Sequence, residues 1–191
     1  MIAAIKGNGV ICIGYLECKE YGVPFEDYVR IENIPYFIDR ETLVFFAQTN
    51  ASSDFLIYNN EIFQGKISVD AIRKNILPQI RNIAQKYHNI ENGRWNNALV
   101  ICKEGKLFAI TPDFYVRETM DYFCFGYSPE YAKSVLEMEQ TLAPKDRIIR
   151  AFRFYDWCTG ESGCPLIYID TRDKQLKILN GGNRDEHNIS V

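Results

Sequence analysis

Strand-like and helix-like segments follow one another in blocks along the chain, and this order limits the folds that the sequence can adopt. Short apolar runs bounded by turn residues predict strands. They lie at residues 2–6, 10–14, 28–34, 36–38, 43–48, 97–103, 107–111, 114–117, 122–125, 166–170 and 175–179. Gly7-Asn8-Gly9 separates the first two runs, and glycine and asparagine tolerate the backbone angles of a tight hairpin turn. The sequence therefore opens with a predicted antiparallel hairpin.

Four predicted helices lie between these strands in two pairs. They span about residues 49–59, 69–87, 129–139 and 145–158. Ser68 is a suitable N-cap for the second helix. Pro78 inside that helix predicts a kink or an interruption, because proline lacks the amide proton. Ser128 is the expected N-cap of the third helix, with Pro129 in the first helical position.

The resulting order is strands, two helices, strands, two helices and strands. Helices that come in pairs between hairpins predict an α+β fold, whereas alternating single βαβ units would favour a parallel sheet. We expect a four-layer αββα sandwich, with two antiparallel sheets between helical layers. The 191 residues suit one domain. Residues 1–180 are expected to form it, and residues 181–191 are expected to be a polar C-terminal tail.

Composition and charge argue against several classes of function. The net charge is −3, whereas general nucleic-acid binders carry a basic surface. The densest cationic group, Lys145, Arg147 and Arg150, is expected to be an ordinary solvated helix face. No apolar run approaches the ~20 residues of a membrane-spanning helix, and Lys6 and Gly7 interrupt the only candidate for a secretory signal. These features predict a cytoplasmic protein that binds neither nucleic acid nor membrane.

The six cysteines include no CxxC pair, which predicts free thiols in a reducing compartment. Three lie inside apolar runs and are expected to be buried: Cys12, Cys102 and Cys124. Cys18 is the alternative nucleophile, because the neighbouring Lys19 would lower its pKa. Cys158 and Cys164 are expected to be ordinary loop thiols.

The histidines and tryptophans give weaker signals. His88 and His187 have no partner at metal-ligand spacing, so neither a metal nor a cofactor is predicted. Trp95 and Trp157 are expected to fill the core. Trp157 follows Asp156 directly, so the alternatives are that it lines a pocket or anchors an interface.

Five local motifs occur in a definite order between about Ile2 and Leu179. They are Ile2-Ala-Ala-Ile-Lys-Gly-Asn-Gly-Val10, Ala47-Gln-Thr-Asn-Ala51, Gln64-Gly-Lys-Ile-Ser-Val69, Phe125-Gly-Tyr-Ser-Pro-Glu-Tyr-Ala132 and Asp156-Trp-Cys-Thr-Gly160. Together they resemble the proteasome-type β-subunits, which are N-terminal nucleophile hydrolases. The resemblance implies that these motifs are, in turn, the first hairpin, the turn into the first helix, the entry to the second helix, a Gly-Ser-Gly turn and an Asp-x-x-Ser-Gly turn.

The same resemblance implies a set of catalytic positions, and this chain departs from it at most of them. The family uses an N-terminal threonine as nucleophile, a lysine that favours its ionisation and a backbone N–H that stabilises the oxyanion. Met1 and Ile2 stand at the nucleophile position, and neither can attack a carbonyl. Arg30 stands at the lysine, and an arginine stays charged. Gln48 replaces the glycine of the oxyanion turn, and Tyr127 replaces the serine of the Gly-Ser-Gly turn.

Only Asp156, Thr159 and Gly160 keep the residue types that the family uses. Leu16 stands near the position of the orienting aspartate, with Glu17 beside it. This pattern of losses predicts a chain without the family's peptidase chemistry.

Three functions follow from the resemblance. The first is a non-catalytic proteasome-like subunit that acts through oligomeric assembly, with copies of itself or with a proteasome-like co-subunit. The second is an active threonine-type or other N-terminal nucleophile peptidase or amidohydrolase, which would need a different nucleophile such as Cys18. The third is a small-molecule-binding module that reuses the vestigial pocket, with Arg30 and Asp156 as anchors.

Overall fold

The structure is a computed structural model whose elements form two compact units. It describes residues 2–7, 10–16, 36–47, 51–119, 121–126, 128–160, 166–172, 174–179 and 186–189. The first unit combines strands and helices from the two ends of the chain, and the second is built from the central segment between them.

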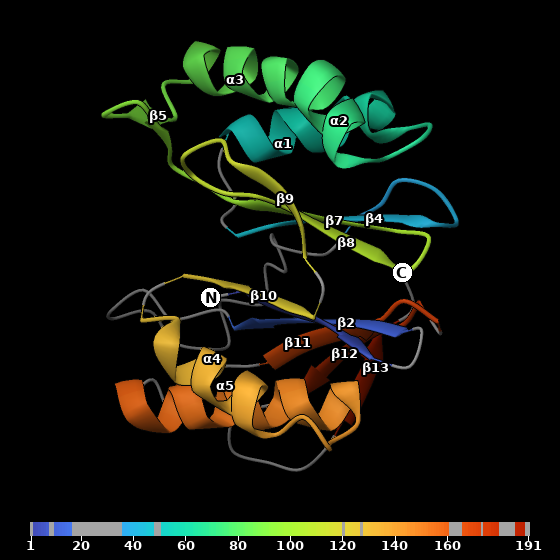
Figure 1. Cartoon of the computed structure of the whole chain (residues 1–191), viewed down its shortest axis with the longest axis vertical. Helices are drawn as coiled ribbons and strands as arrows, with labels where there is room; N and C mark the ends of the chain where they lie inside the picture. Colours follow the sequence, from blue (N-terminus) through green and yellow to red (C-terminus); the bar gives the residue numbers. More distant parts are fainter. Residues whose placement is uncertain are drawn as a thin grey trace. The chain divides into compact units, whose positions relative to one another are not determined.

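Six antiparallel strands form the sheet of the first unit, in the order β10-β1-β2-β11-β12-β13 (Figure 1). They are β1 (Ile2–Gly7), β2 (Val10–Leu16), β10 (Tyr122–Phe125), β11 (Leu166–Asp170), β12 (Leu176–Leu179) and β13 (Glu186–Ile189). Pairing of β1 with β2 runs from Ile2 opposite Tyr15 to Gly7 opposite Val10. The predicted opening hairpin is therefore confirmed, and it lies in the middle of the sheet.

Two helices cover one face of this sheet (Figure 1): α4 (Glu130–Met138) and α5 (Pro144–Thr159). The hydrophobic cluster on that face contains Ala3 and Ile5 of β1 together with Phe152 of α5. Because successive side chains of a strand point to opposite faces, Ile2 and Ala4 lie on the other face. Both are also buried, so β1 is apolar on both sides.

Two glycines let α5 approach the backbone of the first hairpin. A Cβ atom on Gly7 would lie 2.4 Å from Cγ of Pro144. A Cβ atom on Gly14 would lie 2.5 Å from Cε2 of Phe152 and 2.6 Å from Cγ2 of Ile148. Since real Cβ atoms do not come this close to other carbons, the position of α5 depends on the missing side chains at both sites.

Five antiparallel strands form the main sheet of the second unit, in the order β3-β4-β7-β8-β9. They are β3 (Tyr36–Phe37), β4 (Thr42–Phe46), β7 (Leu99–Lys103), β8 (Lys106–Ile110) and β9 (Val116–Thr119). Helical segments cover one face of it (Figure 1): α1 (Ala51–Tyr58), η2 (Asn60–Phe63), α2 (Val69–Ala71), η3 (Ile72–Ile76) and α3 (Leu77–Lys86).

The segments α2, η3 and α3 follow one another without a break and correspond to the predicted helix with an internal proline. Ser68 caps its start, since the Ser68 hydroxyl accepts a hydrogen bond of 3.1 Å from the backbone N–H of Ala71. The interruption is the π-helical segment η3, and Pro78 lies in the first turn of α3 directly after it. The N–H of Leu77 donates to the carbonyl oxygen of Ile72, five residues back, so the helix already departs from α-helical pairing just before the proline.

Aromatic rings form the centre of the second core. Trp95 is 1% exposed, stacks on Phe114 with ring centroids 6.1 Å apart, and meets the ring of Phe46 edge-on at 6.4 Å. The Arg81 guanidinium lies 4.7 Å from the centroid of Phe114. The indole N–H of Trp95 donates to the Ser52 hydroxyl at 3.4 Å. The prediction that Trp95 fills the core is confirmed.

The α+β class with antiparallel sheets and two pairs of helical segments is confirmed, whereas several local expectations differ. Ser128 is not an N-cap, because its backbone has φ 43° and Pro129 occupies the cap position. A short hairpin of β5 (Ile90–Glu91) and β6 (Arg94–Trp95) was not predicted. Strand β13 pairs with β12 inside the segment expected to be a polar tail. The strand predicted at residues 28–34 lies outside the described residues.

Candidate functional site

The start of β1 is where the family would carry its nucleophile. Ile2 pairs with Tyr15 of β2 and with Phe125 of β10, and its side chain is 1% exposed. No residue of β1 carries a hydroxyl or a thiol. Met1 lies outside the described residues. The described strand therefore offers neither of the two nucleophiles, a hydroxyl or a thiol, that could stand in this position.

The sequence predicted a turn from Asp156 to Gly160, and in the structure these residues form the last turn of α5. The Thr159 hydroxyl donates to the carbonyl oxygen of Tyr155 at 2.9 Å. The backbone N–H of Gly160 donates to the carbonyl oxygen of Asp156 at 3.0 Å, and Gly160 ends the helix with φ 73°. A glycine in this left-handed conformation is a common helix stop. The proton of the Thr159 hydroxyl is thus used within the helix.

The hydrophobic cluster of the first unit shows which face of β1 packs against this end of α5. Tyr155, one turn before Thr159, belongs to the same hydrophobic cluster as Ala3. Ala3 faces α5, and Ile2 points to the opposite face of the strand. The side chain of Ile2 and the helix end are therefore on opposite faces of the sheet.

Four of the predicted site residues lie outside the described residues: Met1, Arg30, Gln48 and Tyr127. The elements that flank two of them are defined. The N–H of Ala47 donates to the carbonyl oxygen of Ala98 at 2.9 Å, and α1 begins at Ala51. The segment with Gln48 thus joins the end of β4 to the start of α1, as the motif predicted. Tyr127 lies between β10 and α4.

Sequence reasoning missed a buried charge at the other end of α5. Arg147 was expected on a solvated face, but it is 4% exposed. Its Nη2 lies 3.2 Å from Oδ2 of Asp121, and the carbonyl oxygen of Asp121 accepts a hydrogen bond of 2.7 Å from the N–H of Lys6. Arg147 therefore ties α5 to β1 and to the start of β10. The available signal was its place beside Ile148 on the apolar stripe of the helix.

Among the described cysteines, the structure favours a structural role. Cys12, Cys102 and Cys124 are buried, as predicted, and Cys158 is half-buried. Burial raises the pKa of the Cys124 thiol to about 12, so this thiol is protonated at neutral pH. Cys18 and Cys164 lie outside the described residues.

Tyr122 and Glu137 form the most perturbed polar pair in the described part of the first unit. The Tyr122 hydroxyl donates to a carboxylate oxygen of Glu137, which joins β10 to α4. Burial, followed by this hydrogen bond, raises the pKa of Tyr122 to about 12. The raised pKa keeps the Tyr122 phenol neutral at neutral pH, and the hydrogen bond holds it in place.

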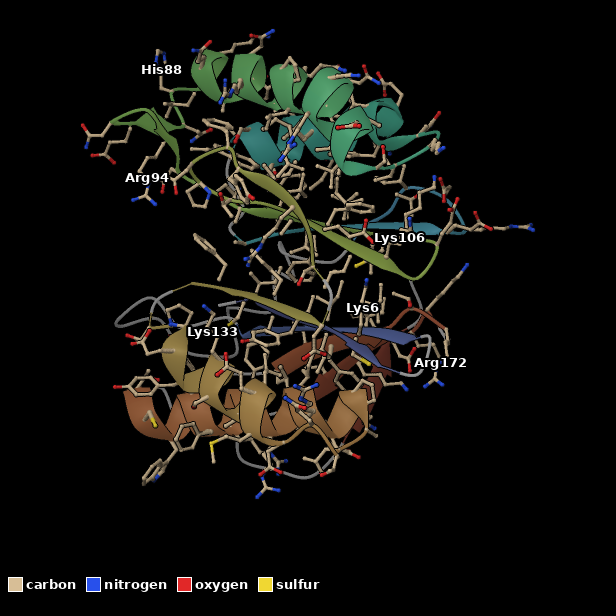
Figure 2. The ribbon with its side chains drawn as sticks, in the orientation of Figure 1. Lys6, His88, Arg94, Lys106, Lys133 and Arg172 are labelled. Carbon is tan, nitrogen blue, oxygen red and sulfur yellow. The ribbon has the colours of Figure 1, made fainter. Side chains whose placement is uncertain are left out.

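The described residues offer no metal site, since no three of their His, Cys, Asp or Glu side chains gather to hold an ion. His88 follows α3, is exposed and points away from the second unit (Figure 2). Within the part of the chain that the structure describes, no helix is long and apolar enough to cross a membrane.

Neither protein-family models nor curated proteins match this sequence. Solved structures do. BPH from Thiobacillus denitrificans aligns with a TM-score of 0.70 and 13% identity, over 88% of this chain and 96% of BPH. The same protein in complex with epoxomicin aligns with a TM-score of 0.65 and 16% identity, over the same shares of both chains.

Two further structures cover the chain as widely. Anbu, an ancestral beta-subunit from Yersinia bercovieri, aligns with a TM-score of 0.58 and 12% identity, over 99% of this chain and 86% of Anbu. HslV from Trypanosoma brucei aligns with a TM-score of 0.57 and 12% identity, over 88% of this chain and 97% of HslV. Each neighbour is matched over most of its own length. The chain therefore has the fold of the proteasome-type N-terminal nucleophile hydrolases, as the order of its elements predicted.

Proposed function

We propose that this protein is a non-catalytic proteasome-like subunit that acts through oligomeric assembly in the cytoplasm. The observation that carries the proposal is the pairing of this fold with a first strand that begins at Ile2 and contains neither a hydroxyl nor a thiol. In the family the nucleophile stands at the start of that strand. A fold kept without its nucleophile is consistent with a role in assembly, with copies of itself or with a proteasome-like co-subunit.

The residues at the other site positions support the loss of chemistry. Met1 has no nucleophilic group. Arg30 would keep its charge at any pH at which a lysine could act as a base. Thr159 is the one hydroxyl among the candidate residues that the structure describes, and its proton is bonded to Tyr155 within α5. Among the candidate residues that the structure describes, the one hydroxyl therefore donates to a backbone carbonyl and not to a base.

Epoxomicin gives a direct test of the lost chemistry, because BPH has been solved in complex with it. Both proteins would be incubated with epoxomicin and their intact masses measured, with BPH as the positive control. We expect the inhibitor to be retained by BPH while this chain keeps its unmodified mass. An adduct on this chain would overturn the non-catalytic part of the proposal.

Peptide mapping would then identify the reacting group. An adduct at the N-terminal residue would indicate that the protein is an active peptidase or amidohydrolase of the threonine type. An adduct at Cys18 would identify a different nucleophile. Either result would leave the fold unchanged and replace the assembly role with an enzymatic one.

A further inference from the structure

An exposed Asn-Gly pair forms the turn of the β5–β6 hairpin in the second unit. Asn92 and Gly93 are both exposed and have φ angles of 50° and 77°. Two central residues with positive φ are typical of a type I′ turn, for which Asn-Gly is a preferred sequence. The hairpin projects from the rest of the second unit (Figure 1). The pair is therefore accessible to water, and asparagine is among the chemically labile residues.

The residue after Asn92 favours a reaction between its side-chain amide and the main chain. Glycine carries no Cβ, so the backbone nitrogen of Gly93 can approach Cγ of Asn92 without a side chain in the way. A Cβ atom built on Gly93 would meet no other atom within 4 Å. The turn is thus open on this side, and neighbouring groups do not block the movement of its backbone.

The hairpin is also held weakly enough to open. Strands β5 and β6 have two residues each and form a two-stranded sheet of their own, with Glu91 opposite Arg94. A two-stranded hairpin is marginally stable in water. Arg94, labelled in Figure 2, has its Nε 2.8 Å from Oδ1 of Asp113, and this exposed ion pair adds little. Local opening lets Asn92 leave its turn conformation, as attack on its side chain requires.

We propose that Asn92 is a site of spontaneous deamidation, in which the backbone nitrogen of Gly93 attacks Cγ of Asn92. A C–N bond forms and closes a succinimide ring, while the bond from Cγ to the side-chain nitrogen breaks. The proton of the Gly93 amide leaves with that nitrogen as ammonia. A water molecule then opens the ring. Hydrolysis at Cγ gives aspartate, and hydrolysis at the backbone carbonyl gives isoaspartate, in which the main chain runs through the former side chain.

The two products differ in their effect on the hairpin. Aspartate leaves the main chain unchanged and, like asparagine, tolerates positive φ. Isoaspartate adds a carbon atom to the main chain inside a two-residue turn, and the length of that turn fixes the register of β5 against β6. Ile90 pairs with Trp95 in this register, and Trp95 is 1% exposed in the second core. Isoaspartate at position 92 therefore destabilises the second unit, whereas aspartate adds only a surface charge.

Peptide mapping of the full chain tests the site. The native protein would be kept in mildly alkaline buffer, sampled over days and digested, and the mass of each asparagine peptide measured. We expect the Asn92 peptide to gain the mass of an amide-to-acid exchange and to separate into aspartate and isoaspartate forms. Asn82 is the internal control, because it is exposed in the same unit but lies inside α3 and precedes Ile83. Mapping also distinguishes Asn92 from the other Asn-Gly pairs of the sequence, at Asn8 and Asn180.

A urea-unfolded sample, aged in the same buffer, gives the rate of the reaction in the open chain. If Asn92 of the native protein keeps its amide as long as Asn82 does, the inference is wrong. Reaction at Asn92 in the unfolded sample would then show that the native turn protects it. The inference does not depend on the proposed assembly function, and neither result bears on that function.

Urea unfolding of the aged protein tests the effect of isoaspartate. Ageing should lower the urea midpoint of the unmodified chain, while unaged Asn92→Asp should unfold like the fresh unmodified chain. Asn92→Gln, aged in parallel, controls for changes at other asparagines, because glutamine would have to close a larger ring. We expect its midpoint to stay constant during ageing. An equal fall in the midpoints of both aged proteins would contradict the role of position 92.

Discussion

At the scale of single residues, Gly14 is the position at which a small change has the largest expected effect. It lies in β2 directly under Ile148 and Phe152 of α5. We expect Gly14→Ala to destabilise the protein by about 1–3 kcal/mol, since overpacking forces neighbouring side chains out of place. Urea unfolding measures the change. Combining it with Phe152→Leu should recover part of the loss, whereas strictly additive effects would show that the two positions are not in contact.

The described thiols should differ sharply in reactivity. Cys124 has its pKa raised to about 12 by burial, so roughly one molecule in ten thousand is a thiolate at pH 8. Cys158 is half-buried. At pH 8, iodoacetamide should therefore modify Cys158 while Cys12, Cys102 and Cys124 stay unmodified until the protein unfolds. Peptide mapping of the native protein measures the extent of alkylation at each cysteine. Fast labelling of Cys124 in the native protein would contradict the packing of β10 under α4.

Sequence patterns predicted the burial of single residues correctly where the residue lies inside an apolar run. Cys12, Cys102 and Trp95 were placed correctly in the core. Trp157 was not, since it is 79% exposed although core packing was expected. The prediction for Arg147 was wrong in the opposite sense, since a solvated side chain was expected and the residue is buried. Both lie on α5, where the helix period leaves neighbouring residues on different sides, and composition alone does not say which side meets the sheet.

At the scale of elements, the helix around Pro78 shows how an unfavourable residue is accommodated. The N–H of Leu77 donates to the carbonyl oxygen of Ile72, a π-type bond that lets a new α-helical segment begin just before the proline. Pro78 thereby occupies a first-turn position instead of a helix interior. The π-helical segment and the proline are thus adjacent in the chain.

Substitution at Pro78 should therefore have a small effect. We expect Pro78→Ala to change the free energy of unfolding by less than about 1 kcal/mol, because the π-helical segment before Pro78 already accommodates the proline. Asn82→Pro, at an exposed position inside α3, should instead cost about 3 kcal/mol or more. Thermal or urea unfolding of both variants gives the comparison. A large gain from Pro78→Ala would mean that the π-helical segment is strained.

The long elements were predictable, and the short ones were not. The strand at residues 122–125 and the helix that ends at Thr159 were placed within about one residue, because each carries a clear apolar pattern. The two-residue strands β5 and β6 carry too few residues for any periodicity to be visible. Strand β13 has the polar sequence Glu-His-Asn-Ile, and its pairing with β12 depends on tertiary context.

At the scale of the whole molecule, the fold and the candidate site differ in how far the sequence determines them. The fold depends on the order of strands and helices, which is shared with BPH at 13% identity. The site depends on the identity of a few residues, and the resemblance leads us to expect that this chain differs from the family at most of those positions. A pattern is therefore enough to predict the fold, whereas the proposed function rests on the residues that replace the nucleophile and its partners.

The native mass of the particle, measured by light scattering after size-exclusion chromatography, with the intact chain mass from the same sample, tests the central proposal most directly. We predict a particle of several subunits whose chains are not cleaved to expose a hydroxyl or a thiol at the first residue. This result would show assembly together with an N-terminus that lacks the family's nucleophile. A monomer, or a chain whose first residue carries a hydroxyl or a thiol, would contradict the proposal.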